Sequence, residues 1–133
     1  MIIGYCYVVG DILHFGHVQH LKNCKALCDK LICGVLTDQA TMEKKSRPII
    51  PFKERLELVG EIKSVDAVVA QETYSPAGNV EAIKPDILFE STSHKDPCKN
   101  PYGRTILMPY FPLQSSSLIK TKVKNRWEAK IID

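Results

Sequence analysis

The sequence predicts an α/β fold built on a parallel β-sheet. Two apolar runs, residues 2–9 and residues 31–36 of a strand at 30–36, have the composition of strands that are covered on both faces. A stretch with helical spacing, from about His17 to Leu27, lies between them. This strand–helix–strand order is typical of a βαβ unit with a right-handed crossover. With 133 residues, the chain is expected to form one domain, residues 1–133, that buries a substantial core.

The composition is that of a globular protein and gives no indication of a nucleic-acid partner or a membrane span. A hydrophobic content of 44% and a charged content of 25% are ordinary for a globular protein that folds in water. The net charge of +3 is mild: it suits a pocket for phosphates and does not require nucleic acid as a partner. No apolar run approaches the roughly 20 residues that span a bilayer. No membrane span is therefore expected. Residues 1–4 also lack a charged leader, so a cytoplasmic location is expected.

The cysteines are expected to be buried thiols. Their number, five, is odd and argues against a closed disulfide framework. Cys24 and Cys28 share a helical stripe with Leu21, which should face the sheet, while Cys6 and Cys33 fall inside the two strands. Buried thiols act as small hydrophobic side chains, so no metal site is predicted.

A turn between the first strand and the helix carries two histidines. His14 and His17 lie three residues apart, and Gly16 stands just before the second. The start of a helix offers free N–H groups and the positive end of its dipole, and a glycine lets a phosphate approach the backbone closely. Both imidazoles could therefore donate hydrogen bonds to a bound phosphate. A turn histidine with only a structural role is the alternative.

The second strand ends at Asp38, on the edge where open α/β sheets bind ligands. A polar segment, residues 41–51, follows and holds Lys44, Lys45 and Arg47. It could close over a triphosphate, or it could be an ordinary solvated loop. Residues 51–62 then form a helix, because apolar side chains recur on one face at Leu56 and at later helical positions.

The remaining elements follow in alternation. Strands are predicted at residues 65–69, 86–89 and 105–108, and a short helix at 79–83 is closed by Lys84-Pro85. Residues 90–94 form a polar loop on the ligand side of the sheet, and residues 96–104 form a loop rich in Pro and Asn. A last helix begins after three serines, which are good N-cap residues and would also form an anion site. Its basic residues, including Lys120, are expected to be solvated.

Four of these segments together resemble the nucleotidylyltransferase superfamily with the H-x-G-H signature, and its cytidylyltransferase branch in particular. The first match is Asp11, Leu13, His14, Gly16 and His17. The others are Glu54-Arg55, the strand at 65–69, and the serines before the last helix. Val8, Gly10 and Tyr110 stand where the branch usually has a glycine, an aromatic residue and an arginine.

The resemblance covers residues 3–125 and implies a Rossmann-like three-layer α/β/α fold with five parallel strands in the order 3-2-1-4-5. It implies transfer of a nucleotidyl group from CTP to a small phosphate or phosphonate acceptor, with release of pyrophosphate. Mg²⁺ would travel with the triphosphate, and a homodimer is expected. ATP as the donor is one alternative, and a nucleotide-binding regulatory domain without catalysis is another.

The resemblance also assigns roles to residues. His14, His17 and a lysine of the 41–51 loop would be catalytic; Lys44 is favoured over Lys45. Arg55 would contact the nucleotide, although it could instead pair with Glu57 or Asp38. The expected nucleotide-binding residues are Val9, Gly10, Asp11, Gly16, Arg55, Ser91, Ser115, Ser116 and Ser117.

Overall fold

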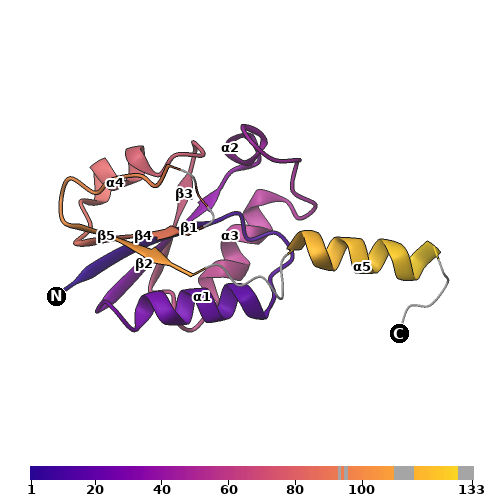
Figure 1. Cartoon of the computed structure of the whole chain (residues 1–133), viewed down its shortest axis with the longest axis horizontal. Coiled ribbons are helices and arrows are strands. Elements are labelled where there is room, and N and C mark those ends of the chain that lie inside the picture. The colour runs from indigo at the N-terminus through magenta and orange to yellow at the C-terminus, as the bar shows by residue number, and fades with distance from the viewer. Residues whose placement is uncertain (93, 95, 110–115, 129–133) are drawn as a thin grey trace.

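The computed structural model describes residues 1–92, 94, 96–109 and 116–128 of the chain (Figure 1). Five parallel strands form one sheet in the order β3-β2-β1-β4-β5, which confirms the predicted order. The strands are β1 (Ile3–Val8), β2 (Lys30–Leu36), β3 (Ala67–Gln71), β4 (Ile87–Ser91) and β5 (Arg104–Met108). The helices are α1 (Phe15–Lys25), α2 (Asp38–Met42), α3 (Phe52–Gly60), α4 (Ala77–Ile83) and α5 (Ser116–Glu128).

Side chains alternate between the two faces of the sheet and form a core on each. On one face, Cys6 and Cys33 pack with Leu21 and Cys24 of α1 and with Val59 of α3. The opposite core centres on Tyr5, Leu88 and Val80, the last from α4. The fold therefore has the predicted three layers. As expected, all five cysteines are free thiols, and three of them are buried.

Several element boundaries differ from those expected. The helix predicted from His17 begins at Phe15, because the His14 side chain caps it. Val18, on the same stripe as Leu21, is 43% exposed rather than buried. A one-turn helix, α2, occupies the start of the segment expected to be a loop, where the hydroxyl of Thr37 accepts a hydrogen bond from the N–H of Ala40 at 3.1 Å.

The last helix stands apart from the other elements. Figure 1 shows α5 projecting away from the sheet, with only its first turn near the body of the molecule. None of its residues is buried, and Trp127 is 71% exposed. None of the helices in the described part of the chain is long and apolar enough to cross a membrane.

Candidate active site

A cavity of about 630 Å³ opens where the carboxyl ends of β1 and β4 meet the first turns of α1 and α5. This is the edge of a parallel sheet at which open α/β folds bind ligands. The predicted site residues that line it are Val9, Asp11, His14, Gly16, His17, Ser91, Ser116 and Ser117. Segments more than 100 residues apart in the sequence therefore line one cavity. Ser115 lies outside the described residues.

The two histidines are held by hydrogen bonds to the backbone at the start of α1. The Nδ1 atom of His14 accepts a hydrogen bond from the N–H of Gly16 at 3.0 Å. The Nδ1 atom of His17 accepts one from the N–H of His14 at 3.3 Å. The ring centroids are 4.1 Å apart. Together they form a reciprocal cap at the end of the helix where its dipole favours an anion.

This capping decides which ring nitrogen carries the proton. A neutral imidazole has one donor and one acceptor nitrogen, so an accepting Nδ1 leaves Nε2–H as the donor in each ring. Burial lowers the pKa of His14. It also lowers the pKa of His17 to about 4, and the neighbouring rings of His14 and His20 add to the effect. Both side chains are therefore neutral near pH 7 and present Nε2–H donors to the cavity.

Asp11 joins the turn after β1 to two distant segments. The residue is 4% exposed. Its two carboxylate oxygens accept hydrogen bonds from the N–H groups of Ile49 and Ile50, both at 3.0 Å. The Nζ atom of Lys120 lies 2.6 Å from the same carboxylate. Although burial alone would raise the pKa of Asp11, these donors hold it below its ordinary value. Gly10, just before it, makes the turn at φ +74° and does not line the cavity.

The first turn of α5 contacts the turn after β1 directly. The hydroxyl of Ser116 donates a hydrogen bond to the carbonyl of Asp11. Lys120 lines the cavity and pairs with Asp11, so the expectation that it is only a solvated surface residue is wrong. Its distance from Ser116, one helical turn, is the signal that could have identified it, because both then lie on one face.

The structure changes the choice between the two loop lysines. Lys45 lines the cavity, whereas Lys44 turns away, with its Nζ atom 5.3 Å from the centre of the Tyr74 ring. The preference for Lys44 came from the family resemblance, in which spacing from Asp38 allows either lysine. Because α2 ends at Met42, the direction of each following side chain is set by this helix, which the sequence analysis did not include.

Arg55 does not face the cavity. Its side chain is fully buried, and the guanidinium pairs with Asp38 at 2.6 Å. It also donates hydrogen bonds to the carbonyls of Val9, Leu36 and Ile50, at 2.5, 2.7 and 2.9 Å. The pairing with Asp38 was the alternative considered from sequence, but it lies inside the protein and not on its surface. Arg55 therefore holds the strand ends beneath the site and does not line either cavity, so its expected contact with the nucleotide stays a prediction.

A smaller cavity of about 100 Å³ adjoins the larger one. Lys45 and His20 line both cavities. The other walls of the smaller cavity include Tyr7, Tyr74 and Glu90, of which Glu90 is 2% exposed. The sequence analysis did not assign a role to this group. The one feature of the sequence that pointed to this group was the position of Glu90 at the end of an apolar strand.

The larger cavity has the chemistry of a polyphosphate site. Neutral imidazole donors, two lysines and the first turns of two helices surround it, and all of these favour an anion. Among the described residues, no group of three or more His, Cys, Asp or Glu side chains is placed to hold a metal ion. Asp11 lines the cavity, but its oxygens are already occupied by Lys120 and by the N–H groups of Ile49 and Ile50.

The chain is similar in sequence to known proteins. The family model described as cytidylyltransferase-like matches residues 9–110. "Bifunctional protein HldE" of Helicobacter acinonychis is 36% identical over 124 residues, which is 88% of this chain and 26% of that protein. The protein of the same name from Proteus mirabilis is 40% identical over 87 residues, or 64% of this chain and 18% of that protein. The chain thus spans about a quarter or less of the length of these relatives.

Two solved structures share the fold. A lipopolysaccharide core biosynthesis protein from Thermoplasma volcanium superimposes with a TM-score of 0.76 at 27% identity, over 84% of this chain and 98% of that chain. Pantoate-beta-alanine ligase from Francisella tularensis superimposes with a TM-score of 0.51 at 12% identity, over 92% of this chain and 69% of that one. The second likeness concerns the fold alone.

Proposed function

The chain belongs to the cytidylyltransferase-like family of nucleotidyltransferases, and from this premise we propose that it transfers a nucleotidyl group to a small phosphate or phosphonate acceptor. The observation that carries the proposal is the pair of neutral imidazoles, which present Nε2–H donors at a helix start inside a cavity of about 630 Å³. A triphosphate is the anion that best fits donors spread over α1, α5 and the 41–51 segment.

The chemistry is a displacement at phosphorus. An oxygen of the acceptor phosphate attacks the α-phosphorus of the nucleotide, the new P–O bond forms, and the bond to the β-phosphate oxygen breaks. Pyrophosphate leaves with the electron pair of that bond. His14 and His17 donate hydrogen bonds to the α-phosphate oxygens as negative charge develops on them. Lys120 opposes the charge of the β- and γ-phosphates, Lys45 stands at the junction of the two cavities where the acceptor phosphate approaches, and the protein forms no covalent intermediate.

Mg²⁺ is part of the proposal as a companion of the triphosphate. It would offset the charge on the phosphate oxygens, and Mg²⁺ commonly binds in this way with few protein ligands. The cavity fits this arrangement because Asp11 is engaged by Lys120 and by two backbone N–H groups, so the triphosphate and water would supply the ligands.

CTP is the proposed donor, and ATP is the competing one. The spacing of the sequence motifs and the description of the matching family both favour CTP. A site that hydrogen-bonds one base leaves buried polar groups unpaired when it meets the other, at a cost of about 1–3 kcal/mol for each missing bond. We therefore expect kcat/KM with CTP to exceed that with ATP by about tenfold or more.

Pyrophosphate release tests the proposal. The protein is incubated with Mg²⁺, CTP or ATP, and a panel of small phosphates and phosphonates. Release that depends on both nucleotide and acceptor supports the proposal, and a preference for ATP would change the donor while leaving the chemistry intact. Tight nucleotide binding without release for any acceptor would contradict it and favour a regulatory nucleotide-binding domain.

A further inference from the structure

The smaller cavity adjoins the larger one. It is formed at the carboxyl ends of β1, β2 and β4 and by the loop after β3, and it shares Lys45, His20 and Ser91 with the larger cavity. An acceptor whose phosphate meets Lys45 at this junction would extend the rest of its structure into the smaller cavity. Its volume of about 100 Å³ corresponds to roughly three water molecules at liquid density, enough for a short carbon chain.

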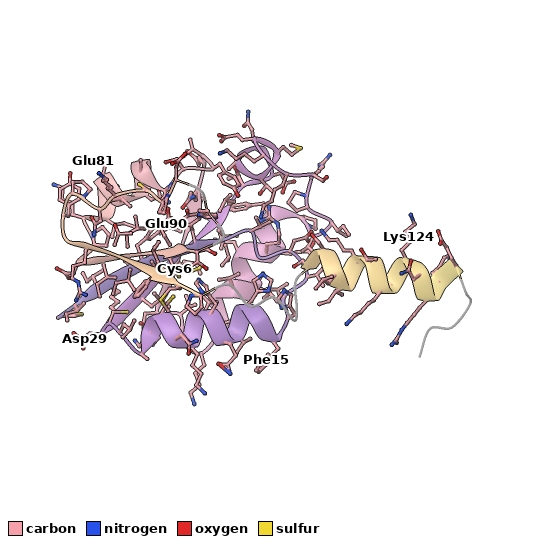
Figure 2. All side chains as sticks on the ribbon, viewed as in Figure 1. Cys6, Phe15, Asp29, Glu81, Glu90 and Lys124 are labelled. Carbon is pink, nitrogen blue, oxygen red and sulfur yellow. The ribbon has the colours of Figure 1, made fainter. Side chains whose placement is uncertain are left out.

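Glu90 is the carboxylate on the wall of this cavity. Figure 2 shows it within the body of the molecule, at the end of β4. Its Oε1 atom accepts a hydrogen bond from the hydroxyl of Tyr7 and lies 3.3 Å from Nδ1 of His94. Its Oε2 atom accepts one from the N–H of Cys98 at 2.6 Å. Two carboxylate oxygens offer about four acceptor positions, so Glu90 keeps capacity for a further donor.

The two tyrosines beside Glu90 remain protonated. Burial raises the pKa of Tyr7, and its hydrogen bond to Glu90 raises it further. Burial also raises the pKa of Tyr74, with a smaller contribution from the charge of Glu90. The wall thus combines one carboxylate acceptor with neutral phenol groups.

The loop that carries Tyr74 is held in place by hydrogen bonds to a buried side chain of β3. Gln71 is 1% exposed, and its amide donates hydrogen bonds to the carbonyls of Thr73 and Tyr74, both at 3.1 Å. Its Oε1 atom accepts a hydrogen bond from the buried hydroxyl of Tyr5 at 2.5 Å. The loop that carries Tyr74 is therefore anchored to the centre of the sheet.

The charges around the cavity distinguish two kinds of donor group. An ammonium group would be drawn to Glu90, but it would also meet Lys45 on the cavity wall. The ammonium of Lys44 already lies over the Tyr74 ring, 5.3 Å from its centre, where a second cation would otherwise be favoured. A neutral hydroxyl can donate to Glu90 without this repulsion.

From these contacts we infer that Glu90 is a specificity-determining residue, which accepts a hydrogen bond from a hydroxyl group of the acceptor. The inference rests on the proposed function. It concerns the end of the acceptor that is remote from its phosphate, which would lie beside Glu90. The acceptor is accordingly a small phosphate or phosphonate that carries hydroxyl groups. Alkyl phosphates and amino-alkyl phosphates of the same length are poorer substrates.

The test compares matched acceptors and variants by pyrophosphate release with Mg²⁺ and the preferred nucleotide. The acceptor panel pairs glycerol 3-phosphate with propyl phosphate, and longer polyol and sugar phosphates with alkyl phosphates of equal carbon number; phosphoethanolamine represents the ammonium class. We expect the best hydroxyl-bearing acceptor to exceed its alkyl counterpart at least tenfold in kcat/KM. Glu90→Gln should remove most of this ratio and leave the KM for the nucleotide unchanged.

Two further variants separate recognition from folding. Tyr7→Phe keeps the ring but frees an acceptor position on Glu90, so it should lower the ratio less than Glu90→Gln. Glu61→Gln removes an exposed carboxylate at the end of α3 and should change nothing. Circular dichroism and nucleotide binding show whether each variant is folded.

Each outcome has one meaning. Glu90→Gln that slows all acceptors equally, with the ratio kept, would show a purely structural role and overturn the inference. Fastest turnover with phosphoethanolamine or an alkyl phosphate would overturn it as well, while the nucleotidyl transfer stands. No pyrophosphate release from any acceptor with either nucleotide would overturn the proposed function, and the inference with it.

Discussion

At the scale of single residues, the two histidines combine structure and chemistry in one ring. In each, Nδ1 accepts a backbone N–H and so leaves Nε2–H for the ligand. These two roles can be separated by mutation. An asparagine at position 14 can accept the hydrogen bond from Gly16 through its side-chain oxygen, as asparagine does at many helix starts, but it cannot reach the phosphate.

The first prediction uses that difference. His14→Asn should keep the wild-type melting temperature but lower turnover by roughly a hundredfold or more, the usual cost of losing one transition-state donor. His14→Ala should lose a similar amount of turnover and also about 1 kcal/mol of stability, because the cap is gone. His17→Ala should lower turnover in the same range. Pyrophosphate release and thermal unfolding check this; normal turnover in any of these variants would place the phosphate elsewhere.

The second prediction concerns the stability of the protein against pH. His17 has a pKa of about 4 in the folded protein and an ordinary value of 6.5. Between these values the unfolded chain binds the proton and the folded chain does not, so stability rises with pH across this window and falls on acidification. The contribution is at most about 1.4 kcal/mol per pH unit.

Urea unfolding of the wild type and of His17→Asn, measured from pH 4.5 to 7, isolates this contribution. The variant should show a flatter dependence, because asparagine does not titrate. Asp11 and Asp66 have pKa values below their ordinary ones, so their stabilisation is lost at lower pH than that of His17. Parallel curves for the two proteins would contradict the prediction.

The third prediction follows from the two loop lysines. Lys45→Ala should lower kcat/KM by more than tenfold, because it removes a cation from the junction of both cavities. Lys44→Ala, its matched control, removes a cation that lies over Tyr74 and should have a smaller effect. Both side chains are exposed, so neither change should shift the melting temperature much. A larger loss in Lys44→Ala would restore the choice made from the family resemblance.

At the scale of elements, Arg55 links α3 to the ends of β1 and β2. It fills a buried position where a guanidinium meets one carboxylate and three backbone carbonyls. The fourth prediction is that Arg55→Ala lowers the free energy of unfolding by about 3–5 kcal/mol, because Asp38 and the carbonyls lose their donor. Urea unfolding measures this, with Lys53→Ala, an exposed cation on the same helix, as the control. A loss no greater than that of the control would contradict it.

The elements also show what sequence patterns can predict. The strands at 30–36 and 86–89 are apolar from Leu31 and from Ile87 onward, so their type and order followed from composition and from the alternation with helices. Thr37 and His14 are harder to interpret, because each starts a helix through a local side-chain bond that hydrophobic periodicity does not record. The missed helix α2 and the early start of α1 both come from such caps.

At the scale of the whole molecule, the site was predictable where a motif is local, but not where it depends on long-range contacts. The H-x-G-H turn and the serine cluster were identified from sequence, and the structure brings the turn together with Ser116 and Ser117 at the start of α5. Arg55, Lys120 and Glu90 differ, because their roles depend on partners 17 to 109 residues away, or on which face of the sheet a strand end presents. Propensity and spacing do not contain that information.

The last prediction concerns assembly. The expectation of a homodimer gains a physical reason from α5, which projects from the body of the molecule (Figure 1). None of its thirteen residues is buried. A helix of this length is marginal in water without a packing surface, and Val123 and Trp127 are 56% and 71% exposed. A second copy can cover these side chains, and a net charge of +3 per chain opposes association only weakly.

Sedimentation velocity should therefore give a dimer. Val123→Ser combined with Trp127→Ser should shift it toward the monomer, whereas Leu58→Ser, at a residue of α3 that is 46% exposed, should not. A monomer at every concentration, or a dimer unaffected by the double variant, would show that α5 is not the contact between copies.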